Sequence, residues 1–333
     1  ANDVASKDES VEFKIRPIIT AVTPNSGNEI WPVGSEQVVS WTAVGNLSNV
    51  KLEYSTNGFS DEGQTNPIAT VVNLGATGTC TRPTGGGCYV WQIPNAISPP
   101  ATKNIKVRIS DPDVPGTNHL SNDPFRIVGG FAITAPNGTP SAESWEVESL
   151  QTITWNKWGS VADVKLAYTK NDSDWIDIDT DAVNGSNTDN GGCTAPVGQG
   201  CYKWEIPNDI SATAKVRVMD INDPDGKDVS NAIFHIRPDM TLTDPNSGED
   251  WAVGSQQTIS WKTIGTVTNV KLEYSKLGDF SDVLTIATPA NVGATGACTI
   301  PEGDTGCYLW TVPNQIANNT VKVRVSDADA GHP

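Results

Sequence analysis

Acidic side chains cluster in a loop that recurs three times along the chain, and these are the residues best suited to chemistry. The middle copy spans residues 220–228 and is the richest. Carboxylate and amide oxygens at this short spacing suit calcium, a hard ion that takes roughly six to eight oxygen ligands. The spacing departs from an EF-hand because Pro224 occupies a ligand position, and a solvated Asp/Pro/Gly turn is the alternative. The candidate calcium ligands are Asp220, Asn222, Asp223, Asp225 and Asp228, with weaker copies at Asp111 and Asp113 and at Asp327 and Asp329.

Catalytic motifs are missing from the sequence. It contains no nucleophile elbow, no metalloprotease helix and no phosphate loop. The glycine turns at 75–78 and 293–296 precede cysteine pairs without a following lysine, so we interpret them as ordinary turns. A glycosidase needs two carboxylates at a fixed separation, but 39 acidic residues create such pairs by chance. We therefore predict that the protein is not an enzyme and that calcium is its one candidate cofactor.

The charge balance restricts the partners. Acidic residues outnumber basic ones by 39 to 22, which gives a net charge of −17 across 333 residues. This charge disfavours nucleic acid and anionic membranes and favours divalent cations as counterions. No apolar run approaches the roughly 18 residues of a transmembrane helix. The chain opens at Ala1 without a signal-like segment, so we expect that any secretion signal has already been removed.

Six cysteines form three close pairs at the same place in three repeats. Zinc sites usually combine Cys-x2-Cys with further Cys or His ligands, and the chain has only three histidines. We therefore predict three disulfides, each stapling the hairpin before a Tyr-x-Trp strand, and an oxidising, extracellular compartment. By the loop-entropy model each small ring should stabilise its domain by roughly 2 to 3 kcal/mol. The predicted pairs are Cys80 with Cys88, Cys193 with Cys201 and Cys298 with Cys307.

Five Asn-x-Ser/Thr sequons fall in predicted turns or between strands. Some will arise by accident in a chain this rich in Asn, Ser and Thr. The candidate glycosylation sites are Asn46, Asn137, Asn171, Asn184 and Asn318.

The elements that position these residues repeat in a fixed order. Each repeat has a tryptophan in its first long apolar segment, then a Val-Lys-Leu-x-Tyr stretch, the cysteine pair, a Tyr-x-Trp stretch and a Val-Arg-(Ile/Val) stretch. So many markers in one order indicate internal duplication. The markers are Trp41, Trp155 and Trp261; residues 50–54, 164–168 and 270–274; residues 89–91, 202–204 and 308–310; and residues 107–111, 216–220 and 323–327.

Apolar and polar residues alternate within these markers, which is typical of strands with one buried face. Val50, Leu52 and Tyr54 should point inward while the residues between them face water. About seven short strands per hundred residues, separated by turn residues, predict a two-sheet sandwich. The repeated tryptophans then belong to the core. Trp158 and Trp175 occur only in the middle repeat and are better candidates for exposed contacts.

The combined motifs resemble the immunoglobulin-like, fibronectin-III-like repeats of large bacterial and archaeal secreted and surface proteins. The resemblance rests on Pro-Asn-Ser-Gly-x-x-x-Trp, Gln-x-(Val/Ile)-Ser-Trp, Val-Lys-Leu-Glu-Tyr-Ser and Val-Arg-(Ile/Val)-Ser-Asp, and it covers nearly the whole chain. It implies an all-β chain of three tandem β-sandwiches. Such repeats occur in filaments, adhesins, surface layers and spacers beside secreted hydrolases, so the resemblance fixes function only loosely. The middle repeat departs most, with Ala167 in place of a glutamate.

The repeats predict domains at residues 18–129, 130–238 and 239–333, joined by linkers too short for independent tumbling. We therefore expect a fairly stiff rod. Residues 1–17 form a separate N-terminal segment. Its stretch 11–17 matches residues 124–128 and 233–238, which close the first and second repeats. The third repeat stops where the other two continue to that closing strand.

One strand is therefore spare at the front, and one is missing at the back. We predict that Val11, Phe13 and Ile15 of the spare strand enter the third domain of a neighbouring copy, because an open sheet edge is a template for strand addition. The alternative is a giant tandem chain of which one period is present. Either arrangement would continue the repeats at the same spacing.

These observations predict a subunit of an extracellular filament or surface fibre that polymerises head to tail with copies of itself. A repeat of a surface adhesin, with a surface glycan or host-cell contact, is one alternative. A carbohydrate-binding or spacer region of a secreted enzyme is the other. Extracellular or cell-surface localisation is common to all three.

Overall fold

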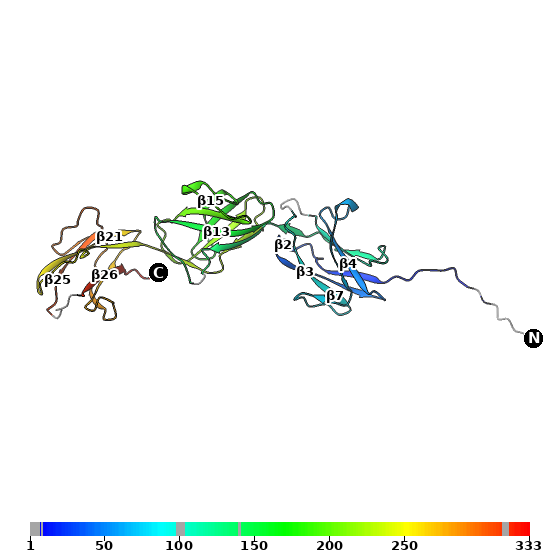
Figure 1. The fold of residues 1–333 in the computed structure, drawn as a ribbon, viewed down its shortest axis with the longest axis horizontal. Helices are drawn as coiled ribbons and strands as arrows, with labels where there is room; N and C mark the ends of the chain where they lie inside the picture. The colour runs from blue at the N-terminus through cyan, green and yellow to red at the C-terminus, as the bar shows by residue number, and fades with distance from the viewer. Residues whose placement is uncertain (1–6, 8, 98–103, 139–140, 315–319) are drawn as a thin grey trace, which may run out of the picture. The chain divides into compact units, whose positions relative to one another are not determined.

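The computed structural model describes residue 7 and residues 9–97, 104–138, 141–314 and 320–333. Strands dominate these residues, and the short 3-10 helices Glu62–Gln64 and Asp189–Gly191 accompany them (Figure 1). The chain is therefore all-β, as predicted. In the described part of the chain, no helix is both long and apolar enough to span a membrane.

The first repeat folds as two facing sheets, which are antiparallel except for the parallel pair β6 with β7. One has the order β1-β3-β7-β6 and the other the order β5-β4-β8-β9. A short parallel pair, β10 with β2, closes the side of the sandwich. The strands are β1 Ile18–Thr23, β2 Ile30–Pro32, β3 Glu36–Val44, β4 Asn49–Ser55, β5 Thr65–Val72, β6 Ala76–Thr77, β7 Gly86–Gln92, β8 Lys106–Ser110, β9 Asn118–Leu120 and β10 Arg126–Val128.

The second repeat has the same succession of strands except that it has no counterpart of β6 among its described residues. Its sheets are β11-β13-β16 and β12-β19-β17-β14-β15, with β18 also paired to β17. The parallel pair β12 with β19 repeats the closure of the first repeat. The strands are β11 Gly130–Ala135, β12 Ser144–Glu146, β13 Leu150–Trp158, β14 Asp163–Thr169, β15 Ile176–Val183, β16 Gln199–Glu205, β17 Ser211–Asp220, β18 Lys227–Val229 and β19 Phe234–Arg237.

The third repeat has two sheets but no closing pair among its described residues. The sheets have the orders β20-β21-β25-β24 and β23-β22-β26. The central strands keep one order in all three repeats, β1-β3-β7 with β5-β4-β8 and their counterparts, which is that of an immunoglobulin-like or fibronectin-III-like sandwich. The strands are β20 Asp239–Asp244, β21 Gln256–Ile264, β22 Val270–Ser275, β23 Leu284–Ala287, β24 Gly293–Thr295, β25 Gly306–Thr311 and β26 Lys322–Asp327.

The alternation of the sequence produces the core. In β17, Ala214, Val216 and Val218 are fully buried, while the residues between them are more exposed. The central tryptophans are also fully buried, which confirms their predicted core position. Each needs a partner for its indole N–H, since a buried unpaired donor is costly. Trp41 Nε1 donates to Asn73 Oδ1 at 2.9 Å, and the other repeats copy this bond.

The described chain divides into two compact units. Unit 1 comprises residues 1–130 with 158–161 and 222–226, and unit 2 contains the remainder. The first strands of the repeats begin at Ile18, Gly130 and Asp239. Those positions coincide with the domain starts that the sequence predicts, and the division into three domains stays a prediction.

Candidate functional site

The closing strand of the first repeat shows what completes a sandwich. Phe125, just before β10, is fully buried, and its ring lies 4.6 Å from that of Trp31. Ile127 is opposite Trp31 in the parallel register. The backbone N–H of Val33 donates to Val128 O at 2.9 Å. The closing strand thus covers the core and also holds the β2 segment as a strand.

The second repeat reproduces this closure. Phe234 and Ile236 of β19 are fully buried, and the Phe234 ring lies between Trp145 at 4.9 Å and Trp204 at 6.3 Å. The backbone N–H of Val147 donates to Arg237 O at 2.9 Å. Two independent copies of one arrangement indicate that it is the normal end of this sandwich.

The third repeat lacks that cover. In the described residues β26 pairs with β22 alone, and residues 251–253 form no strand. Val253 is 48% exposed, whereas its counterparts Val33 and Val147 are 1% and 2% exposed. Val323 and Val325 of β26 are half-buried, although the matching residues of β8 and β17 are fully buried. We call the surface formed by Trp251, Val253, Val323 and Val325 the acceptor slot.

The aromatic wall of the acceptor slot already has the closed geometry. Trp251 and Trp310 lie 6.1 Å apart with an interplanar angle of 66°. The corresponding pair in the second repeat, Trp145 and Trp204, lies 6.2 Å apart at 72°. The wall therefore needs little rearrangement to receive a phenylalanine, which lowers the entropic cost of binding.

The N-terminal segment is the opposite case, an exposed stretch whose sequence matches the two closing strands. Its described residues form no strand, and Figure 1 draws residues 9–17 outside the sheets of the first repeat. Val11, Phe13 and Ile15 are 88%, 75% and 87% exposed. Large apolar side chains at alternate positions are seldom left in water, so these three indicate a contact surface. We call residues 9–17 the donor segment.

The spacing of the donor segment matches the two closing strands. Phe13 precedes the first residue of β1, Ile18, by five positions. Phe125 precedes the start of β11 by five, and Phe234 precedes the start of β20 by five. The residues just before β1 and β20 also have similar surroundings. Pro17 lies against Gly45 as Pro238 lies against Gly265, and both glycines have φ +106°. The donor segment leads into its repeat as a closing strand does.

The three predicted disulfides are present. Cys80 bonds to Cys88 of β7, Cys193 to Cys201 of β16, and Cys298 to Cys307 of β25. Each links the strand that carries the Tyr-x-Trp motif to the loop before it. The pairs fix the position of that strand and lie outside the acceptor slot.

The predicted calcium ligands of the middle repeat contact other protein groups. Both oxygens of Asp223 lie 2.6 Å from Arg126 Nη2, and Asp225 pairs with Arg126 Nη1. Asp228 accepts the backbone N–H of Ile133 at 2.7 Å, and burial raises the pKa of its carboxyl. Asp220 is buried. Sequence reasoning missed Arg126 as the partner because it lies almost a hundred positions away. Calcium binding by Asp220, Asn222, Asp223, Asp225 and Asp228 stays a prediction.

The other copies of the acidic loop shape turns. Asp111 Oδ1 accepts the backbone N–H of Asp113 at 2.9 Å. In the third repeat the carboxylates of Asp327 and Asp329 approach His332, with ligand atoms within 4.8 Å of one another. Asp329 already accepts two backbone N–H groups, from Thr268 and Asn269. His332 was not predicted, since one histidine near a chain end gives no pattern.

The two unusual tryptophans are half-buried. Trp158 packs against the core cluster of the first repeat, and Trp175 has the Arg217 guanidinium 4.2 Å from its ring centre. Neither is among the exposed large apolar residues. Each is partly covered by a neighbour that the sequence could not identify, and a role of either residue in an exposed contact stays a prediction.

The candidate glycosylation sites differ in accessibility. Asn46 and Asn171 are exposed, and Asn137 is half-buried with its amide bonded to Ile133 O. Asn184 is 3% exposed and accepts the Trp155 indole N–H at 2.8 Å, so the prediction of a glycan there is wrong for the folded chain. Asn318 lies outside the described residues.

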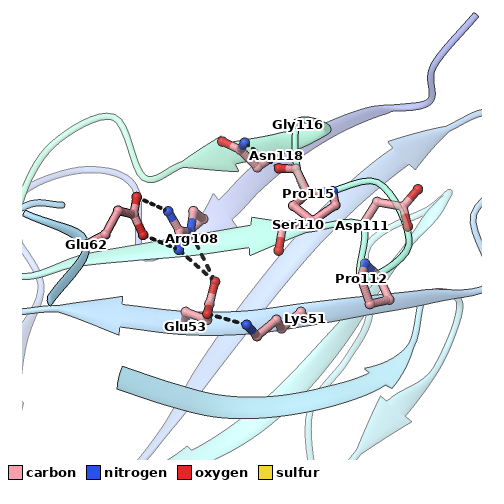
Figure 2. A pocket seen from close by; sticks show the side chains of 10 residues that line it. All are labelled: Lys51, Glu53, Glu62, Arg108, Ser110, Asp111, Pro112, Pro115, Gly116 and Asn118. Carbon is pink, nitrogen blue, oxygen red and sulfur yellow. Dashed lines mark hydrogen bonds and ion pairs between the residues drawn. The ribbon is translucent and has the colours of Figure 1, made fainter. Parts of the chain in front are cut away.

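A hollow on the first repeat is lined by several charged side chains (Figure 2). Arg108 bridges Glu53 at 3.0 Å and Glu62 at 2.7 Å. Lys51 pairs with Glu53 at 2.6 Å. These side chains are engaged with one another, so they act as a network across β4 and β8.

Comparisons with known proteins leave the family open. No protein-family model and no curated protein sequence matches the chain. Among solved structures it is similar to the fibronectin(III)-like modules of Clostridium thermocellum CbhA, at 15% identity, covering 66% of this chain and 93% of that one, with a TM-score of 0.20. It is similar to titin domains A168–A170 at 10% identity, covering 95% and 94%, with a TM-score of 0.26. The ICAM-5 D1–D4 ectodomain fragment has 11% identity, covers 94% and 75%, and has a TM-score of 0.23.

Proposed function

We propose that the protein is a non-catalytic structural subunit of an extracellular fibre, in which the donor segment of one copy closes the third repeat of the next. The observation that carries this proposal is the uncovered acceptor slot in a chain that also exposes a segment with the apolar spacing of the two closing strands. Tandem sandwiches with three disulfides fit an extracellular repeat protein. A cell-surface location is part of the proposal.

The register of the contact follows from the second repeat, where β12 and β19 pair in parallel. The first expected pair brings Lys14 opposite Asp250, and the attraction between their opposite charges favours this register. The second places an isoleucine on the tryptophan of the slot, as in both closed repeats. The expected pairs are Lys14 with Asp250, Ile15 with Trp251, and Arg16 with Ala252.

Burial supplies the driving force. Phe13 would enter between Trp251 and Trp310, the place that Phe234 takes between Trp145 and Trp204. Full burial of an aromatic or branched aliphatic side chain is worth about 1.5 to 3 kcal/mol. Phe13 and Ile15 together would therefore contribute about 3 to 6 kcal/mol before the cost of ordering the segment. Backbone hydrogen bonds between the donor segment and residues 249–253 would fix the orientation of the segment in the slot.

A contact of this kind polymerises without limit. The donor and the acceptor are different surfaces of one chain, so each copy added exposes a new slot, and a heterologous contact that does not close forms a fibre. The alternative source of the closing strand is the sequence that follows the third repeat in one giant tandem chain. Both give the same local geometry, and they differ in whether separate copies associate.

A cysteine trap tests the register. Lys14→Cys with Asp250→Cys should give a ladder of covalent oligomers under mild oxidation, because these residues are neighbours only across two copies. Lys14→Cys with Glu302→Cys is the matched control, since Glu302 is exposed on a loop away from the slot. Equal ladders from both variants, or monomers from the first, would contradict the proposal.

Peptide binding separates the two sources of the strand. A chain lacking residues 1–16 should remain monomeric and bind a peptide of residues 9–17, which raises the melting temperature of the third repeat. The same peptide carrying Phe13→Asp and Ile15→Asp is the control. A truncated chain that still forms fibres would exclude strand donation. A truncated chain that binds the peptide, beside a full chain that stays monomeric at high concentration, would favour the tandem alternative.

A further inference from the structure

Two equivalent asparagines hold the turns that follow β13 and β21 in the described chain, and the N–H groups that they bind differ by one position. Asn95 follows β7, and its Oδ1 accepts the backbone N–H of Gly159 at 2.6 Å within unit 1. Asn208 follows β16, and its Oδ1 accepts the backbone N–H of Thr266 at 2.8 Å within unit 2. Asn208 Nδ2 also donates to Thr266 Oγ1 at 2.8 Å. We call this arrangement the seam contact.

Each seam contact has an apolar side. The residue before the held turn is the last of a long strand, Trp158 in β13 and Ile264 in β21. Trp158 lies so close to Gly34 that a Cβ there would be 2.6 Å from the indole. Gly265, after Ile264, lies against Val147, whose Cγ2 would be 3.3 Å from an added Cβ.

The chain has exposed counterparts of both sides of the seam contact, the asparagine at one end and the turn at the other. Asn314 follows β25 as Asn95 follows β7, and its side chain is exposed. Gly254, the counterpart of Gly34, has nothing within 4 Å of an added Cβ. At the other end of the chain, Val44 ends β3 and is 71% exposed. The turn that follows it, Gly45 and Asn46, is exposed too.

The register of β1 connects these two halves. Ile18 pairs with Val44, just as Asp239 pairs with Ile264. Ile18 follows the donor segment directly, as Asp239 follows the closing strand of the second repeat. A donor segment seated in a slot therefore carries Val44 and its turn to the place that Ile264 and its turn occupy beside Asn208.

We propose that Asn314 of one copy binds the Gly45–Asn46 turn of the next, with Val44 packed on Val253 and Gly254, as a second point of recognition between copies. This inference rests on the proposed strand donation. The Asn314 Oδ1 accepts the backbone N–H of Asn46, the counterpart of Thr266, and the Asn314 Nδ2 donates to the Asn46 side-chain carbonyl. Two amides are complementary here, since each has one donor and one acceptor group.

If copies meet at a seam contact, changes outside the donor segment should weaken fibre formation. Asn314→Ala removes about two hydrogen bonds, so the critical concentration for fibre formation should rise about tenfold. Val44→Lys, a change at an exposed position, should weaken assembly because the charge would be buried on Val253. Glu302→Ala is the control for a surface change on the same repeat. Sedimentation of the full chain over a concentration series measures all three.

Peptide binding distinguishes the failure of this inference from failure of the strand donation. The peptide of residues 9–17 lacks the Gly45–Asn46 turn, so Asn314→Ala in a chain lacking residues 1–16 should leave peptide affinity unchanged. Unchanged fibre formation by Asn314→Ala and Val44→Lys, beside normal peptide binding, would overturn the seam contact alone. Loss of peptide binding to the unmodified slot would overturn the strand donation and the seam contact with it.

A double-variant cycle checks the pairing. Adding Asn46→Ala to Asn314→Ala should weaken assembly no further, because Asn314→Ala already removes both bonds. Asn46→Ala alone should have the smaller effect, because it keeps the backbone N–H of residue 46. Additive effects would contradict a direct contact between the two asparagines. Thermal unfolding of each variant should match that of the parent chain, since both side chains are exposed.

Discussion

The second and third repeats share nearly every feature except the last strand. Each has a disulfide, a central buried tryptophan and a tyrosine packed on the Tyr-x-Trp tryptophan, at 5.0 Å for Tyr168 and 5.3 Å for Tyr274. Yet the β17 valines are fully buried and the β26 valines are not. The two sheets can therefore keep their arrangement without a closing strand, while one side of the core stays open to a strand from elsewhere.

The comparison also shows that the closing strand shapes a neighbouring segment. Residues 144–146 form β12 because β19 pairs with them, and the corresponding residues 250–252 form no strand. Backbone groups need partners, and a strand forms where a second strand supplies them. Filling the acceptor slot should therefore order residues 250–253 together with the donor segment.

The largest expected effect on stability comes from removing the phenylalanine of the closing strand. The effect of Phe234→Ala should differ from that of Phe13→Ala. Phe234→Ala leaves a cavity between two tryptophans and should lower the free energy of unfolding of the second repeat by about 3 to 5 kcal/mol. Phe13→Ala should leave the unfolding of the monomer unchanged, because Phe13 is exposed there. Calorimetry at a concentration below assembly measures both. Equal destabilisation by the two changes would contradict the comparison.

Loss of a disulfide should come next. Cys193→Ser with Cys201→Ser should lower the free energy of unfolding of the second repeat by about 2 to 3 kcal/mol, as a ring this small predicts. The matching change at Cys298 and Cys307 should do the same to a repeat that is already less covered. The third repeat should then unfold at the lower temperature of the two. A reversed order would show that the missing strand matters less than its exposed core suggests.

The sequence predicted the sandwich fold, the disulfides and the core tryptophans because each leaves a local signal: alternation, paired cysteines and repetition. The repeated spacing of Phe234 and Ile236 also drew attention to Phe13 and Ile15, which are exposed, and their entry into another copy stays a prediction. Prediction from the sequence failed for side chains whose burial depends on residues far away in the sequence. Asn184 begins a sequon but is buried and accepts the Trp155 indole N–H, and Trp158 packs against the core cluster of the first repeat. The bonds of Asn73, Asn184 and Asn291 could have been found from their recurrence.

Acid should lower the stability of the third repeat through the carboxylate of Glu273, which has no counterpart in the second repeat. Burial would raise the pKa of Glu273, but the bonds from Lys271 and Arg324 outweigh it and lower that pKa below 4.5. A lowered pKa in the folded state stabilises the fold above the ordinary value, and this contribution is lost as the pH falls through the lowered pKa. The second repeat has Ala167 at the matching position.

Unfolding of Glu273→Gln and the parent chain at pH 7 and near pH 3 measures this difference. The stability of the third repeat should decline in acid more steeply in the parent chain than in the variant. An identical pH dependence in both would mean that the Glu273 network does not stabilise the ionised form. The second repeat, with its alanine, serves as the internal control.

Calcium should have the smallest effect, because the carboxylates of the second repeat already have partners. To bind Asp223 and Asp225, the ion must displace the Arg126 guanidinium. We therefore expect weak binding, which raises the melting temperature by about 1 to 2 °C at a concentration near Kd, and reversal by a chelator. Arg126→Gln should enlarge the response by freeing both carboxylates, and Asp225→Asn should reduce it. If neither calcium nor chelator moves the transition in the Arg126 variant, the loop is a structural turn whose charges serve Arg126 alone.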